Sequence, residues 1–251
     1  MGLMRVLDLF SGIGGFSLGL ERAGMQTVAF CEIEPYPRAV LRKHWPNVPC
    51  YDDIRTLTAD RLRADGIVPN VICGGFPCQD ISTAGLGAGI NKDTRSGLWE
   101  EYARLIGEIR PQYVIVENVA ALLGRGLERV LGDLAQIRYD AEWHCIPASY
   151  IGAWHRRDRV WLVAYPDKDS GQQGFATGSI LGQRNLHEQS QRSFTRWPGR
   201  SNLPKSRICG RNDGVPAVVD RIAALGNAVI PQIPEIIGRA IMSVHNQGEH
   251  P

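Results

Sequence analysis

The sequence predicts an α/β fold built on a doubly wound, mostly parallel sheet. Its apolar runs are short and rich in Val and Ile, and most are separated by stretches long enough for a helix. This alternation is typical of a parallel sheet covered by helices on both faces. With 251 residues and 43% hydrophobic side chains, the chain can bury one sizeable core without a disulfide or a metal to hold it.

Strands are expected at the apolar runs and helices in the stretches between them. The runs are MRVLDLF (residues 4–10), QTVAFCE (26–32), NVICGGF (70–76), QYVIVEN (112–118) and DRVWLVAY (158–165). A helix is expected from about Ser17, and others at residues 36–44 and 98–109. The pattern is helical again after the basic insert described below, with Pro231 and Pro234 near the start of a final helix.

Cysteine usage and hydropathy indicate a soluble, intracellular protein. The six cysteines form no C-x-x-C pair and the six histidines show no ligand spacing, which argues against a structural zinc site. The amino terminus has no secretory signature, and no run approaches the ~20 apolar residues that a membrane span needs. We therefore expect a cytoplasmic protein without a metal or a membrane partner.

The charge is distributed unevenly along the chain. The overall net charge is only +2, but residues 166–215, called the basic segment from here on, contain eight Lys or Arg and four Asp or Glu. The same residues are rich in glycine and polar side chains and poor in aromatics, which predicts loops with a weak core of their own. A solvated linker and a binding segment are both compatible with this composition.

A glycine-rich loop follows the first predicted strand. Gly12, Gly14 and Gly15 let the backbone pass close to a ligand, and Glu32, about twenty residues further on, can accept hydrogen bonds from ribose hydroxyls. The spacing differs from the dinucleotide pattern G-x-G-x-x-G, because Ser17 stands at the place of the third glycine. The loop favours an adenosyl cofactor over a nicotinamide one, and a purely structural glycine turn stays open.

A thiol and a carboxylate follow two further strands. Cys78 comes after the run NVICGG, and Glu117 ends the run QYVIVE. If both strands are parallel, their carboxyl ends share one rim and the two side chains can face one pocket. A thiolate is a strong nucleophile, and a carboxyl group can hold a proton on a heterocycle nitrogen. Taken singly, each residue is more often structural.

Five motifs carry a family resemblance. DLFSGIGGFSLGLERAG, GGFPCQDIS, VENV, HRRDRVW and LGNAVIPQ, in this order, resemble the motif series of the DNA cytosine-5 methyltransferase family of the bacterial and phage type. The resemblance covers residues 4–165 and 220–243. It implies a Rossmann-like class I methyltransferase fold, with a cofactor-binding and catalytic domain at 1–165, a short target-recognition segment at 166–215, and a C-terminal helix at 216–251 that returns to the catalytic domain.

The resemblance also implies a reaction and the residues that perform it. Cys78 would attack C6 of a cytosine flipped out of a specific duplex DNA sequence, and C5 would then take a methyl group from S-adenosylmethionine, leaving S-adenosylhomocysteine. Glu117 would hold the base, and Arg159 would contact it, with Arg157 supporting Arg159 or a phosphate. The sequence departs from the family before these arginines, where Trp154 and His155 replace Pro-Gln.

The remaining site residues are also assigned by the resemblance. The cofactor site would comprise Phe10, Gly12, Gly14, Glu32, Ile33, Asp53, Ile54, Pro77, Leu98, Asn227 and Val229, with Asp53 toward the adenine amine and Asn227 toward the methionine part. DNA would meet Ser82, Lys92 and Arg95 on a glycine-rich lid between residues 82 and 98, and Arg196, Arg200 and Arg207 in the basic segment.

Three other functions stay open on the sequence. One is an RNA cytosine-5 methyltransferase acting on tRNA, the second is a catalytically silent DNA- or cofactor-binding module of the same fold, and the third is a nicotinamide-dependent oxidoreductase. The expected partner is duplex DNA at the nucleoid of a bacterial or phage-infected cell. We expect a monomer, with any cognate restriction endonuclease acting separately.

Overall fold

A computed structural model describes residues 2–77, 98–153, 157–167, 180–182 and 227–248 of the chain. The strands are β1 (Arg5–Leu9), β2 (Gln26–Cys31), β3 (Cys50–Tyr51), β4 (Val71–Gly74), β5 (Tyr113–Val119), β6 (Tyr139–Pro147) and β7 (Asp158–Pro166). The helices are α1 (Gly15–Arg22), α2 (Pro35–His44), α3 (Ala59–Ala64), α4 (Leu98–Ile109), α5 (Leu122–Arg125), α6 (Leu127–Gln136), the short 3-10 turn η2 (Ala148–Ile151) and α9 (Gln232–Gly248).

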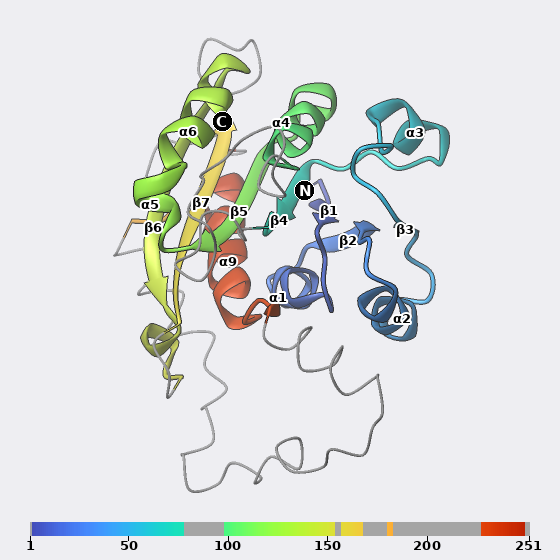
Figure 1. The fold of residues 1–251 in the computed structure, drawn as a ribbon, viewed down its shortest axis with the longest axis horizontal. Coiled ribbons are helices and arrows are strands. Elements are labelled where there is room, and N and C mark those ends of the chain that lie inside the picture. Colours follow the sequence, from blue (N-terminus) through green and yellow to red (C-terminus); the bar gives the residue numbers. More distant parts are fainter. Residues whose placement is uncertain (1, 78–97, 154–156, 168–179, 183–226, 249–251) are drawn as a thin grey trace, which may run out of the picture.

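The seven strands form one sheet in the order β3-β2-β1-β4-β5-β7-β6 (Figure 1). Strands β1 to β5 are parallel, whereas β7 is antiparallel to both of its neighbours. The predicted α/β fold with a mostly parallel, doubly wound sheet is therefore confirmed. The strand order reverses between β1 and β4, and in open α/β sheets a ligand binds outside the carboxyl ends of the strands at such a point.

The prediction missed two strands, β3 and β6. β3 has only two residues, which is too short for any periodic signal. β6 lies at the edge of the sheet, and its residues are mostly exposed or half-buried, with only Tyr139 and Ile146 buried. An edge strand of this kind carries charged and polar side chains and produces no continuous apolar run.

Helices cover both faces of the sheet, as the sequence predicted. On one face α3, α4 and α6 contribute to a large apolar cluster, centred on side chains such as Trp99, Leu105 and Leu134. On the other face α1 and α9 form a second cluster with Phe16, Leu20 and Ile237 (Figure 1). The buried side chains of both clusters supply the apolar burial that stabilises the fold.

Helix α1 starts two residues earlier than predicted and packs closely on α9. Its first residue is Gly15, preceded by Gly14 in a left-handed conformation with φ of 85°. A Cβ atom at Gly15 would lie 2.4 Å from the carbonyl oxygen of Val229, and one at Gly19 would lie 2.2 Å from that of Pro231. The absence of side chains at these two glycines therefore lets the chain before α9 run against α1.

A short part of the basic segment belongs to the core. Ile180 and Leu181 are fully buried in the cluster that contains α1 and α9. Their backbone N–H groups donate to the Glu142 carboxylate of β6 over 2.7 and 3.0 Å. Composition predicted loops with a weak core for residues 166–215, and a two-residue anchor of this kind gives no compositional signal.

Candidate active site at the carboxyl rim of the sheet

The predicted site residues gather where the parallel strands end. Phe10 and the glycine loop follow β1, Glu32 and Ile33 follow β2, Asp53 and Ile54 follow β3, Pro77 follows β4, and Glu117 lies two residues before the end of β5. The carboxyl ends of parallel strands lie at one edge of a sheet. The five strands thus bring residues that are more than one hundred positions apart in sequence to one rim.

The glycine loop after β1 is held open by Glu32. Gly12 has φ of 52° and Gly14 has φ of 85°, values that favour glycine. The Glu32 carboxylate accepts a hydrogen bond from the Gly12 N–H over 2.7 Å and one from the Glu34 N–H over 2.8 Å. A carboxylate has about four acceptor positions, so it can accept further hydrogen bonds besides these two.

The glycine loop is open at Gly12. A Cβ atom at Gly12 would meet no atom within 4 Å, so there is open space over the loop. The side chain of Ile33 is 57% exposed next to Glu32 and offers an apolar surface for a flat ring. Phe10, also at positive φ, packs against the core with its ring stacked 6.3 Å from that of Tyr102. The loop, the carboxylate and the apolar side chain are group types that can contact a nucleoside.

A buried carboxylate fixes the base of the loop, and the sequence prediction missed it. Asp8 of β1 is fully buried, and its Oδ2 accepts a hydrogen bond from the Ser17 hydroxyl over 2.7 Å. Burial raises the pKa of Asp8 to about 7, against the effect of the Ser17 hydrogen bonds. The bond ties β1 to α1 across the loop. The signal in the sequence was one acidic residue inside the apolar run VLDLF.

Asp53 is held by its own loop and by α4. The Arg55 guanidinium donates to both carboxylate oxygens of Asp53, at 2.7 to 3.0 Å, and lowers the pKa of this carboxyl group. Arg104 of α4 donates through one nitrogen to the carbonyl oxygens of Ile54 and Leu57 at 3.0 and 2.9 Å. This arginine, which the sequence prediction also missed, therefore fixes the backbone that carries Asp53.

Glu117 lies in the part of the rim formed by the ends of β4 and β5. Its Oε1 is 2.9 Å from Nε of Arg159, and its side chain is only 12% exposed. A Cβ atom at Gly75 would lie 2.8 Å from Oε2 of Glu117, so a side chain there would displace the carboxylate from its present position. Asn118 is buried, and its amide donates to the carbonyl oxygen of Phe76 over 3.2 Å. The chain leading from β4 to Pro77 is thus fixed directly against Glu117 and Asn118.

The electrostatics of Glu117 combine burial with two nearby cations. Burial raises the pKa of Glu117, whereas Arg159, Arg157 and the hydrogen bond from Arg159 oppose that shift. A raised pKa brings a carboxyl group closer to sharing a proton with a heterocycle nitrogen near neutral pH. Burial and the two cations therefore act in opposite directions on the charge of this carboxyl group.

The two predicted arginines lie close together but have different contacts. Arg159 pairs with Glu117, as described above. Arg157, just before β7, has φ of 37° and donates from Nη2 to the carbonyl oxygen of Ala228 over 2.9 Å. Ala228 lies between the predicted cofactor residues Asn227 and Val229. Arg157 thus contacts the segment before α9.

The remaining predicted residues divide into described and undescribed ones. Ile54 is buried, whereas Pro77, Leu98 and Val229 are half-buried and Asn227 is exposed. Cys78, Ser82, Lys92, Arg95, Arg196, Arg200 and Arg207 lie outside the described residues, as do Trp154 and His155. Within the described ranges, no group of three His, Cys, Asp or Glu side chains could hold a metal ion, and no helix is long and apolar enough to cross a membrane.

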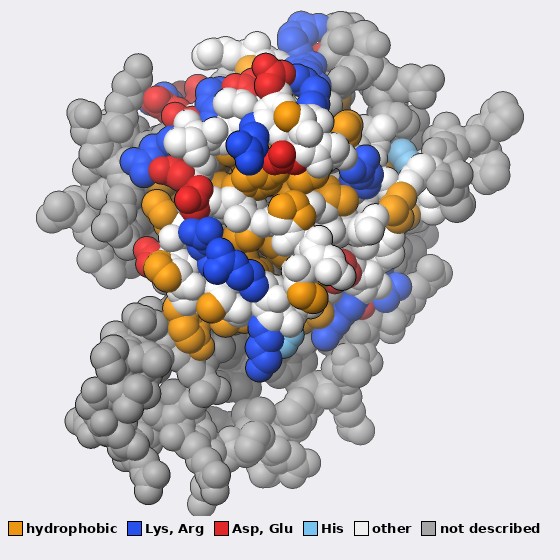
Figure 2. All heavy atoms as spheres, turned by 90° about the vertical axis from the view of Figure 1, so that its right-hand side faces the viewer, with side chains coloured by type: hydrophobic (Ala, Val, Ile, Leu, Met, Phe, Trp, Pro, Cys, Tyr) orange, Lys and Arg blue, Asp and Glu red, His pale blue; other side chains and the backbone are white. Residues whose placement is uncertain are grey.

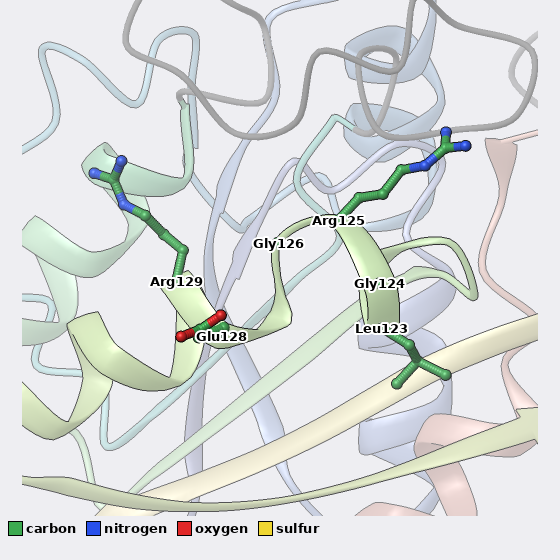
Figure 3. Close-up of a pocket in the computed structure, with 6 residues that line it drawn as sticks. All are labelled: Leu123, Gly124, Arg125, Gly126, Glu128 and Arg129. Atoms are coloured by element: carbon green, nitrogen blue, oxygen red, sulfur yellow. The ribbon is translucent and has the colours of Figure 1, made fainter.

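An open pocket of about 460 Å³ lies next to the end of β5, at the junction of α5 and α6. It is lined by Leu123, Gly124, Arg125, Gly126, Glu128 and Arg129. Figure 3 shows the Arg125 and Arg129 side chains extending away from each other on either side of Gly126. None of the predicted site residues lines it, so the pocket is separate from the chemistry at Glu117.

The surface over α2 and α3 carries mixed charge. Figure 2 shows Lys and Arg side chains interspersed with Asp and Glu and with exposed hydrophobic side chains on this face. On α3 the charges are paired, with Arg61 contacting Asp65 and Arg63 contacting Asp60. These pairs neutralise charge along α3, whereas the last turn of α2 carries Arg42, Lys43 and His44.

Comparisons with known proteins identify methyltransferases that are similar to this chain. The chain is 36% identical over 171 residues to Type II methyltransferase M2.BsuMI of Bacillus subtilis and 27% identical over 217 residues to Type II methyltransferase M.DsaV of Dactylococcopsis salina. These matches cover 64% and 81% of this chain. They cover 42% and 60% of the relatives, so the chain spans about half the length of the curated proteins it matches.

Solved structures of methyltransferases also align with this chain. A candidate DNA modification methyltransferase encoded within an Escherichia coli prophage aligns with a TM-score of 0.56 and 26% identity, covering 66% of this chain and 47% of that one. The Dnmt2 methyltransferase of Schizosaccharomyces pombe shares the fold with a TM-score of 0.59 at 18% identity, over 78% of this chain and 56% of its own. The family model for C-5 cytosine-specific DNA methylases matches residues 4–200, and the chain therefore belongs to that family.

Proposed function

We propose that this protein transfers a methyl group from S-adenosylmethionine to C5 of a cytosine flipped out of duplex DNA. Membership of the C-5 cytosine-specific DNA methylase family supports the reaction class. The observation that carries the assignment is Glu117, a carboxylate with a side chain only 12% exposed, paired with Arg159 and packed against the residues that lead into Cys78.

The cofactor would lie along the half of the rim formed by β1, β2 and β3. Glu32 would accept hydrogen bonds from the ribose hydroxyls and Asp53 one from the adenine amine, with Ile33 against the ring. Asn227 would face the methionine part. When bound, S-adenosylmethionine supplies an electrophilic methyl group on a positively charged sulfur. The open space over Gly12 supports this placement.

The base would lie along the other half of the rim, at the carboxyl ends of β4 and β5. The Cys78 thiolate adds to C6 and moves an electron pair toward C5, while Glu117 holds a proton at N3 and donates to the developing negative charge. C5 then takes the methyl group, loses its proton to a base, and expels the thiolate from C6, which restores the ring. Arg159 keeps the Glu117 carboxylate oriented and neutralises part of its charge.

The DNA would be held by residues outside the described part of the chain together with the rim. The basic segment has eight cationic and four acidic residues, a surplus that phosphates can neutralise. Its two-residue anchor, Ile180 and Leu181, is fixed in the core next to β6 and β7, which supports a segment that is attached to the catalytic domain. The names of the relatives further suggest a role in restriction-modification, with a cognate endonuclease acting separately.

The test is mechanism-based trapping. Sequencing of DNA from cells that express the protein first locates the methylated cytosine, and a duplex carrying 5-fluorocytosine at that position is then incubated with enzyme and cofactor. Because fluorine cannot leave C5 as a cation, elimination stalls and the thiol stays bonded to C6. Mass spectrometry should find protein plus DNA plus one methyl group. tRNA offered in place of DNA should give no product.

Two variants and one matched control assign the roles. Cys78→Ser should form no adduct, whereas Cys145→Ser, which removes an exposed thiol on β6, should trap like the wild type. Glu117→Gln should bind DNA and cofactor but form the adduct about two to four orders of magnitude more slowly. A wild-type enzyme that methylates DNA without giving the adduct, or an active Cys78→Ser variant, would refute the covalent mechanism.

A further inference from the structure

The chain segment before α9 is contacted at three of its carbonyl groups. Helix α1 packs against it, because Gly15 and Gly19 leave room for the carbonyl groups of Val229 and Pro231. Arg157 donates to the carbonyl oxygen of Ala228 over 2.9 Å, across 71 residues of sequence. The segment that carries the predicted cofactor residues Asn227 and Val229 thus contacts both a helix and a guanidinium group.

Arg157 also lies within electrostatic reach of the base half of the rim. It is half-buried, and its pKa is lowered first by burial and then by the like charge of Arg159, with Glu117 acting in the opposite direction. Its φ of 37° places a non-glycine residue in the left-handed region, just before β7 begins at Asp158. Such a strained backbone persists only where surrounding contacts hold it, and it is common at functional sites.

The two arginines have different contacts. Arg159 lies in β7 and pairs with Glu117. Arg157 lies just before this strand, and a guanidinium nitrogen of its side chain reaches the carbonyl group of Ala228.

We infer that Arg157 is a positioning residue for the cofactor: it fixes the segment 227–229 against the rim, and so connects the cofactor half of the site to Glu117 and Arg159. This inference rests on the proposed function and assigns Arg157 a role other than contacting a DNA phosphate or the base. Removing the guanidinium should free the Ala228 carbonyl and loosen the segment, whereas removing that of Arg159 should affect the base and leave the cofactor in place.

The test compares Arg157→Gln with Arg159→Gln in the full chain. Titration calorimetry with S-adenosylhomocysteine, without DNA, should show Kd raised about tenfold by Arg157→Gln, the scale of one hydrogen bond to a charged group, and unchanged by Arg159→Gln. In steady-state methylation, Arg157→Gln should act mainly on KM for S-adenosylmethionine and Arg159→Gln mainly on kcat. Hydrogen exchange of the ligand-free protein should be faster in residues 227–236 for Arg157→Gln alone.

A second variant separates positioning from fold stability. Arg157→Gly removes the guanidinium and also relieves the left-handed strain, since glycine adopts positive φ without cost. If Arg157 positions the segment, this variant should lose affinity for S-adenosylhomocysteine like Arg157→Gln, even where its thermal midpoint is unchanged. Wild-type affinity in either folded variant would overturn the inference.

The outcomes also separate this inference from the proposed function. If Arg157 contacts a phosphate instead, both of its variants keep wild-type affinity for S-adenosylhomocysteine, and the slope of log K for DNA against log salt falls by about one. If the wild-type protein binds no S-adenosylhomocysteine and methylates no DNA, the proposed function itself fails. If the wild-type protein binds S-adenosylhomocysteine and methylates DNA, and Arg157→Gln binds S-adenosylhomocysteine with wild-type affinity, only the positioning role is refuted.

Discussion

The packing of α1 on the chain before α9 predicts opposite effects for two chemically identical substitutions. Gly19 lies inside α1, and a Cβ atom there would be 2.2 Å from the carbonyl oxygen of Pro231 and 2.9 Å from the backbone nitrogen of Glu235. Gly132 lies inside α6, is exposed, and a Cβ atom there would meet nothing within 4 Å. Both positions are helical, so the difference between them isolates the contact with α9.

The magnitudes follow from helix propensity and packing. Replacing a helical glycine by alanine gains about 0.5–1 kcal/mol, and this gain should be seen in full for Gly132→Ala. At Gly19 the same gain is opposed by about 3 kcal/mol of overpacking against backbone atoms, which cannot rotate away as a side chain can. Gly19→Ala should therefore destabilise the protein by about 2 kcal/mol, which corresponds to a thermal midpoint lower by about 4–8 °C for a chain of this size.

Thermal and urea unfolding, followed by circular dichroism, measure both variants. Overpacking at Gly19 should displace the chain segment before α9, which also carries Asn227 and Val229. Gly19→Ala should therefore bind S-adenosylhomocysteine more weakly, while Gly132→Ala should bind it as the wild type does. If Gly19→Ala proves as stable as Gly132→Ala, the close approach of α1 to the segment before α9 is wrong. The assignment of that segment to the cofactor site would then lose its structural basis.

Two further predictions concern side chains that support the loops of the rim, the buried Asp8 and the half-buried Arg104. The pKa of Asp8 is raised to about 7 in the folded state, so the native protein binds one more proton than the unfolded chain between about pH 4 and pH 7, and stability should fall over that range as pH rises. Asp8→Asn should remove this slope, measured by urea unfolding at several pH values; an unchanged slope would contradict the assignment. Arg104→Met should free the carbonyl groups of Ile54 and Leu57 and raise KM for S-adenosylmethionine several-fold at unchanged kcat. Arg129→Met, which removes a similar double ion pair on α6, is the control and should leave KM unchanged.

The sequence predicted those parts of the site that depend on a single strand and the turn after it. Glu32 and Glu117 were placed correctly at one rim, because the run of each strand ends at a recognisable position and parallel strands end together. The buried partners were not predicted. Asp8 and Asn118 stand inside apolar motifs, and their roles depend on Ser17 and Phe76, which only the packed structure brings near.

The contacts of the two arginines could not be derived from the sequence, because they depend on strand direction. In a fully parallel sheet, the start of β7 would lie at the opposite edge from the ends of β4 and β5. β7 instead runs antiparallel to β5, with Arg159 opposite Val119 at the end of that strand. The residues that open β7 therefore lie at the same rim as Glu117. Arg159 then pairs with Glu117, while Arg157, just before β7, donates to the carbonyl oxygen of Ala228, so that the direction of one strand brings the segment before α9 and Glu117 into contact with neighbouring arginines.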